Sequence, residues 1–153
     1  LGAYTLMTAG AFAVLSLVGD ANDRGDALER LAGLGRSRPA LAASLSIFLL
    51  SLAGIPLFAG FVGKVLVFQA AIEADYLWLA VLAIFTSIVA VVYYLRPITY
   101  MYFRESEYAA PSARSGATGL AIGLAVFGTL LLGLVPGLWY GVLTNAPRLF
   151  AGF

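Results

Sequence analysis

The sequence predicts an all-α membrane protein, a polytopic helix bundle with four transmembrane spans of which the second is discontinuous. Three observations predict this class. Hydrophobic residues make up 61% of the chain and charged residues only 11%, against about 25% charged residues in ordinary soluble domains. The mean hydropathy is +0.94. The apolar residues also gather in four stretches, and about 20 such residues let a helix cross the hydrocarbon core.

The first span is predicted at residues 1–18, which carry no charge and contain small residues suited to close helix contacts. Because the chain begins with Leu1 inside this apolar stretch, we expect it to be part of a longer protein. Residues 19–38 hold the densest group of charges and are predicted to be a surface connection. Within it, Leu28, Leu31 and Leu34 have the spacing of a short amphipathic turn.

The second span is predicted at residues 39–72 and is broken near 54–60. As one straight helix, this stretch would be about 50 Å long at ~1.5 Å per residue, whereas the hydrocarbon core is roughly 30 Å thick. Gly54 and Pro56 stand near its middle, and proline there removes a backbone donor and clashes with the preceding turn. We therefore expect two half-helices.

Lys64 is the only charged residue in this stretch and the only lysine in the protein. If Glu73 marks the membrane surface, Lys64 lies about 13 Å inside it. A lysine stem bridges such a depth only with difficulty, which favours a buried functional lysine. The alternative is a shallow or tilted half-helix, from which Lys64 reaches a lipid headgroup.

Transporters use broken helices near the membrane midplane to build ion sites. Burial disfavours the charged ammonium form, so a lysine at such a site can take up and release a proton. Backbone groups left unpaired at 54–60 can hold ordered water. Gly60 and Gly63 either leave space beside Lys64 or permit tight helix packing.

The third span is predicted at residues 76–103 and ends in a cluster of aromatic residues typical of a membrane interface. Arg96 lies inside that end, where it either snorkels outward or pairs with a carboxylate from outside this chain. A polar connection at 104–117, a fourth span at 118–135 and a tail at 136–153 complete the chain.

Basic residues near the span ends predict the orientation. The connections 19–38 and 104–117 are rich in arginine, whereas the acidic turn at 73–75 has no basic residue and the tail has Arg148 alone. Basic residues concentrate in cytoplasmic loops. We therefore expect both connections to be cytoplasmic and the chain termini to lie on the outer side.

Composition also excludes several functions. The net charge of +1 gives no reason to expect nucleic acid as a partner. The chain has no cysteine and no histidine, so it offers no thiolate or imidazole to an iron–sulfur cluster, haem or zinc ion. It also shows no glycine-rich phosphate loop and no hydrolase motif. We expect no cofactor, metal or redox centre in this chain.

Four short motifs in the chain resemble a known family. They are SLAGIP at residues 51–56, AGF at 59–61, GK at 63–64 and YYLR at 93–96. Together they closely resemble the C-terminal third of subunit N of bacterial NADH-quinone oxidoreductase, respiratory complex I. The wider antiporter-like group includes subunits L and M and the Mrp-type cation/proton antiporters. The resemblance covers about residues 1–104.

The resemblance implies a role for several residues. Lys64 matches the lysine regarded as the last proton-relay group on the exit side of the family's half-channel, and Gly54 and Pro56 match the helix break. It also implies the bacterial cytoplasmic (inner) membrane and, as partners, lipids and other membrane-arm subunits of complex I. NADH, FMN, iron–sulfur clusters and quinone are then expected in partner subunits, and the input part of the proton path in earlier helices outside this chain.

Two other functions stay open at this point. The first is a subunit of an Mrp-type sodium/proton antiporter, which exchanges ions without redox chemistry. The second is a structural membrane module, in which Lys64 only pairs with a lipid headgroup.

Overall fold

The computed structural model of this chain describes residues 2–19, 28–56, 58–105 and 116–135. All regular structure in these ranges is helical, which confirms the predicted all-α class. The predicted tail at 136–153 and parts of the two predicted connections, at 20–27 and 106–115, lie outside the described residues. In chain order the elements are α1 (Gly2–Val18), the 3-10 helix η1 (Glu29–Leu31), α2 (Leu34–Ser37), α3 (Pro39–Ala53), α4 (Ala59–Glu73), α5 (Leu77–Phe103) and α6 (Gly116–Leu134).

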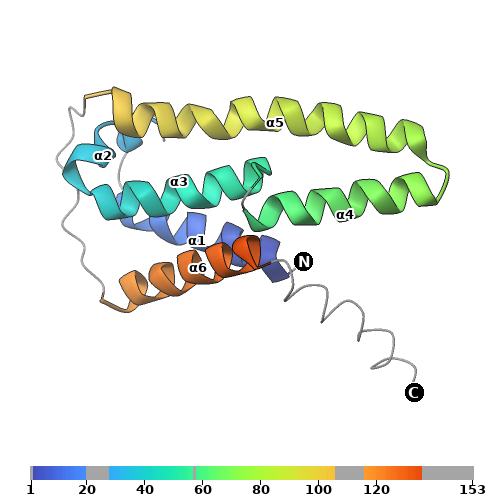
Figure 1. The fold of residues 1–153 in the computed structure, drawn as a ribbon. Helices are drawn as coiled ribbons and strands as arrows, with labels where there is room; N and C mark the ends of the chain where they lie inside the picture. Colours follow the sequence, from blue (N-terminus) through green and yellow to red (C-terminus); the bar gives the residue numbers. More distant parts are fainter. Residues whose placement is uncertain (1, 20–27, 57, 106–115, 136–153) are drawn as a thin grey trace, which may run out of the picture.

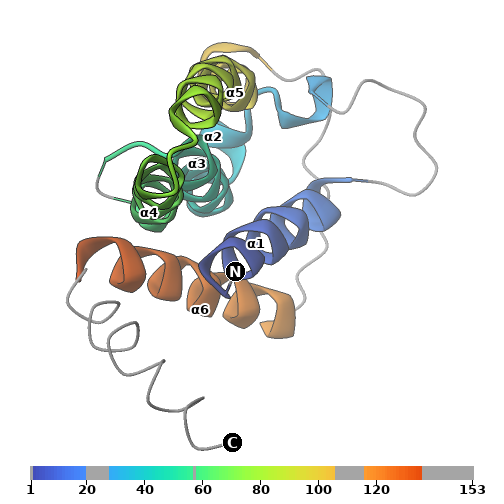
Figure 2. The ribbon, with the colours of Figure 1, turned by 90° about the vertical axis from the view of Figure 1, so that its right-hand side faces the viewer.

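The longer helices form three layers. Helices α3 and α4 follow each other end to end in the middle layer, and α5 runs back along both of them on one side (Figure 1). Helices α1 and α6 contact each other on the opposite side of α3 (Figure 2). The junction between α3 and α4 is therefore enclosed between α5 and the pair formed by α1 and α6.

Local sequence explains where these helices begin and end. α1 stops at Gly19, whose N–H donates to the Leu15 carbonyl at 2.8 Å. α3 begins with Pro39 in its first turn, where the missing N–H leaves no bond unmade. α4 and α5 are joined by a tight turn in which Asp75 has a φ of 60°, a conformation that aspartate tolerates better than most residues.

The connection before α3 packs against the bundle rather than lying free. Leu31 and Leu34 are both buried, as the predicted amphipathic turn requires. At the surface, the guanidinium of Arg36 donates a hydrogen bond of 3.3 Å to the carboxylate of Glu105. The connection is thereby attached to the end of α5.

The hydrophobic core lies at one end of the bundle. It is centred on α1 and α3 and includes the fully buried Val14, Leu45, Phe48 and Met101. The opposite end is much less covered, and much of α4 and of the first half of α5 presents large apolar side chains at the surface. These include Val67, Trp78, Phe85 and Ile88.

Length and composition divide the apolar helices into two groups. α5 and α6 are long and apolar enough to cross a membrane. α1 and α3 are apolar but shorter, with 17 and 15 residues. The predicted four membrane crossings therefore require α3 and α4 to cross together as one span.

Candidate functional site

The site begins at the C-terminal end of α3. Gly54 follows the last helical residue with a φ of 83°, a left-handed conformation that glycine adopts without steric cost. The Gly54 N–H donates to the Ser51 carbonyl at 3.0 Å, and the Ile55 N–H donates to the Leu50 carbonyl at 3.2 Å. These two bonds form a Schellman motif. Gly54 therefore ends α3, and Pro56 follows in the connection.

The two bonds of the Schellman motif go to the carbonyls of Leu50 and Ser51, and Lys64 donates to a later carbonyl of α3. The ammonium of Lys64 donates a hydrogen bond of 2.7 Å to the carbonyl oxygen of Ala53. A cation at a helix C-terminus interacts favourably with the helix dipole as well as with the carbonyl it bonds. The half-buried Lys64 on α4 therefore caps the preceding helix.

Gly54 makes room for this contact. A Cβ atom placed on Gly54 would lie 2.7 Å from Lys64 Cδ and 2.9 Å from Lys64 Nζ. Such distances are shorter than ordinary van der Waals contact. The glycine thus serves twice, because it supplies the left-handed turn and lets the lysine lie across the helix end.

The N-terminal end of α4 is held by α3. The side chain of Ser51 is fully buried, and its hydroxyl oxygen accepts a hydrogen bond of 3.3 Å from the backbone N–H of Gly60. The same hydroxyl donates to the sulfur of Met7 on α1 at 2.6 Å. A Cβ atom on Gly60 would collide with the carbonyl oxygen of Ser51. Gly60 therefore permits tight packing of α4 against the end of α3.

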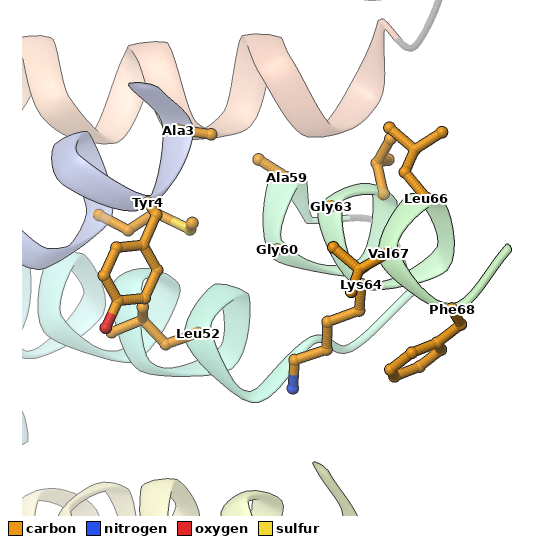
Figure 3. Close-up of a pocket in the computed structure, with 12 residues that line it drawn as sticks. Ala3, Tyr4, Leu52, Ala59, Gly60, Gly63, Lys64, Leu66, Val67 and Phe68 are labelled. Carbon is orange, nitrogen blue, oxygen red and sulfur yellow. The ribbon is translucent and has the colours of Figure 1, made fainter. Parts of the chain in front are cut away.

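A cleft of about 490 Å³ opens beside the junction. In Figure 3, Lys64 extends from α4 towards the end of α3, and Tyr4 and Leu52 lie across the opening from it. The walls are mainly apolar and come from α1, α3 and α4. They are formed by Ala3, Tyr4, Met7, Leu52, Ala59, Gly60, Val62, Gly63, Lys64, Leu66, Val67 and Phe68.

The remaining predicted residues lie in different surroundings. Gly63 borders the cleft, and a Cβ atom there would meet nothing within 4 Å. Pro56 is exposed in the connection. Arg96 is exposed on α5, and its guanidinium bonds to no other side chain among the described residues. The structure thus brings Gly54, Gly60, Gly63 and Lys64 together and leaves Arg96 apart.

Few charged side chains surround Lys64 in the described part of the chain. Within the described ranges no carboxylate pairs with it, and Glu73 on the same helix accepts a hydrogen bond of 2.8 Å from Gln69 instead. No group of three or more possible metal-ligating side chains comes together in that part of the chain. The bond between Lys64 and Ala53 therefore joins a cation to a neutral backbone group.

The role of Ser51 was not predicted from the sequence. Ser51 lies inside the SLAGIP motif, but a serine in an apolar helix usually bonds back to its own turn, as Ser46 does to the Ala42 carbonyl at 2.8 Å. The sequence indicates this contact only when two positions are considered together. Ser51 lies in the last turn before the Gly54 break, and Gly60 lies in the first turn after it.

Residues 1–90 match the family described as NADH:quinone oxidoreductase/Mrp antiporter, TM. This match covers more than half of the chain, which therefore belongs to this family of membrane proteins.

Individual relatives indicate which subunit within this family the chain resembles. The chain is 41% identical over 142 residues to NADH-quinone oxidoreductase subunit N of Trichlorobacter lovleyi, covering 88% of this chain and 28% of that protein. It is 45% identical over 141 residues to subunit N of Thermobifida fusca, covering 90% of this chain and 26% of that protein. The predicted resemblance to subunit N is confirmed.

A solved structure shows the same fold. The chain resembles a chain of respiratory complex I from Thermus thermophilus with bound aureothin, with a TM-score of 0.77 and 38% sequence identity. The match covers 90% of this chain and 32% of that chain. The chain therefore spans only about a third or less of the proteins that it resembles.

Proposed function

We propose that this chain is the C-terminal part of a proton-translocating membrane-arm subunit of bacterial NADH-quinone oxidoreductase. In this proposal it contributes the exit-side part of a proton half-channel, and Lys64 is the relay group. The observation that carries the proposal is the contact between Lys64 and the end of α3, in a chain whose relatives are subunits N of that enzyme.

The proposed membrane arrangement has four spans. These are α1, the α3–α4 pair as one discontinuous span, α5 and α6. The pair lies end to end alongside the 27-residue helix α5 (Figure 1), which supports a single broken crossing. The predicted cytoplasmic connections at 19–38 and 104–117 then lie on one side of a bacterial inner membrane, into which the chain inserts as a multi-pass protein.

The exposed apolar side chains of α4 and α5 support the proposed partners. A surface of this kind is stable in contact with lipid or with further helices. In the proposed assembly these are lipids, the rest of the same subunit and neighbouring membrane-arm subunits of complex I.

The chemistry of the relay follows from the two states of Lys64. The ammonium form donates a charge-assisted hydrogen bond to the Ala53 carbonyl, and such bonds are roughly twice as strong as neutral ones. When the proton leaves, the neutral amine is held less firmly by the carbonyl and by the helix dipole. Water reaching the cleft beside Lys64 can deliver or accept the proton. The input part of the path would be supplied by the remainder of the subunit.

Redox chemistry is proposed to take place elsewhere in the complex. This chain has neither cysteine nor histidine to hold a cluster, so NADH, FMN, iron–sulfur clusters and quinone would bind to partner subunits. This chain is then part of an enzyme without carrying its redox centres. The Mrp alternative is not favoured, because the relatives named above are subunits of NADH-quinone oxidoreductase.

Deleting the gene for the full-length protein tests this function against the alternatives. We expect NADH-driven proton uptake by inverted membrane vesicles to be lost in the deletion strain. In a separate strain that produces a tagged full-length protein, we expect this protein to co-purify with flavin and iron–sulfur subunits. Unchanged NADH-driven uptake together with loss of sodium-dependent proton exchange would overturn the proposal in favour of an antiporter.

A further inference from the structure

Ser51 joins three helices at the point where the discontinuous segment breaks. Its side chain is fully buried in the last turn of α3. It accepts a hydrogen bond of 3.3 Å from the Gly60 N–H on α4 and donates one of 2.6 Å to Met7 on α1. The buried hydroxyls of Ser46 and Thr129, by contrast, donate to carbonyls of their own helices.

The bond to Gly60 replaces an N-terminal cap that α4 lacks. The residue at the N-cap position, Phe58, has no side chain able to accept a hydrogen bond, and no side-chain cap is formed there. The first N–H groups of a helix have no partner within the helix, and one of these belongs to Gly60. Ser51 therefore caps α4 from a neighbouring helix.

The bond between Ser51 and Gly60 and the bond between Lys64 and Ala53 both join the first turns of α4 to the last turn of α3. Gly60 and Lys64 are four residues apart on α4, so they lie on the same face of that helix, one turn from each other. Ser51 and Ala53, their respective partners, both belong to the last turn of α3. Two hydrogen bonds one turn apart thus fix how α4 meets the end of α3.

We infer that Ser51 is a positioning residue for Lys64: by capping α4 through the Gly60 N–H and bonding to Met7, it holds the lysine against the Ala53 carbonyl. This inference rests on the proposed relay role of Lys64. Ser51 itself need not touch the transferred proton. Without its hydroxyl, the start of α4 loses this hydrogen bond to α3 and the link through it to Met7 on α1. The ammonium group is then held less firmly at one place beside the cleft.

The test compares variants of the full-length protein in the assembled complex, by the number of protons taken up per NADH oxidised in inverted vesicles. In Ser51→Ala, we expect the loss of proton yield to be about half or more of the loss in Lys64→Ala. The double variant is expected to lose no more than Lys64→Ala alone, because the two residues act as one unit. Ser46→Ala is the matched control, because it removes a hydroxyl from the same helix that bonds only within its own helix.

Different outcomes separate this inference from the proposed function. A normal proton yield in Lys64→Ala would remove the relay role itself. A loss in Lys64→Ala with a normal yield in Ser51→Ala would overturn the positioning role alone, as would a double variant whose losses simply add. If Ser51→Ala does not assemble, Ser51→Cys takes its place, since a thiol fills similar space with a weaker acceptor.

Discussion

The ammonium group of Lys64 lies 2.7 Å from the carbonyl oxygen of Ala53, to which it donates a hydrogen bond. The two residues belong to different helices that meet end to end (Figure 1). The lysine therefore caps the helix before its own. Any change in its charge alters an interaction at the helix break, and this links the proposed proton relay to the local backbone structure.

Replacing Gly54 should weaken both the helix end and the lysine contact. In Gly54→Ala, a left-handed backbone conformation costs about 1–2 kcal/mol for a residue with a Cβ atom, and that atom would lie 2.7 Å from Lys64 Cδ. We expect a lower thermal midpoint of the purified complex and a lower proton yield per NADH. A variant with both quantities unchanged would show that neither the turn nor the contact is needed.

Gly60 and Gly63 should respond in opposite directions to the same change. Gly60→Ala places a Cβ atom against the Ser51 carbonyl, and such overpacking typically costs about 1–3 kcal/mol. Gly63→Ala enters open space on the same helix, where replacing glycine gains about 0.5–1 kcal/mol.

Thermal unfolding of the two purified variants measures this difference. We expect a lower midpoint for Gly60→Ala and an equal or higher one for Gly63→Ala. Equal destabilisation by both substitutions would mean that Gly63 is covered by other parts of the complete protein.

Pro56→Ala should be milder than Gly54→Ala. The Schellman motif that ends α3 uses the N–H groups of Gly54 and Ile55, so it survives the loss of the proline. We expect normal amounts of assembled protein, as judged by immunoblotting of membranes, and a smaller decrease in proton yield. A larger loss than in Gly54→Ala would make the proline, rather than the left-handed turn, the main cause of the break.

Much of the site could be predicted from sequence because its signals are local. The break follows from Gly54 and Pro56 inside a stretch too long for one crossing, and Lys64 stands out as the only charge within it. The structure nevertheless assigns the end of α3 to Gly54, with the exposed Pro56 following it. Gly54 and Pro56 both predicted a break, but only the hydrogen bonds show that Gly54 ends the helix.

The partners of Lys64 and Gly60 could not be predicted in the same way. Lys64 bonds to a backbone carbonyl, a group that every residue possesses and that gives no signal in a sequence. Ser51 acts across a helix break, whereas sequence reasoning about serine in helices considers the residue's own turn. Arg96 bonds to no other side chain within the described ranges, so the choice between snorkelling and an ion pair depends on surroundings outside those ranges.

The proposed relay requires Lys64 to take up and release protons, and one ratio tests this requirement most directly. Protons taken up per NADH oxidised should be measured in inverted vesicles with the full-length protein and its Lys64→Ala variant. Gln69→Ala serves as a control on the same helix outside the cleft. We expect a lower ratio for Lys64→Ala in a fully assembled complex, and an unchanged ratio for the control. An unchanged ratio in a fully assembled Lys64→Ala complex would contradict the proposed relay.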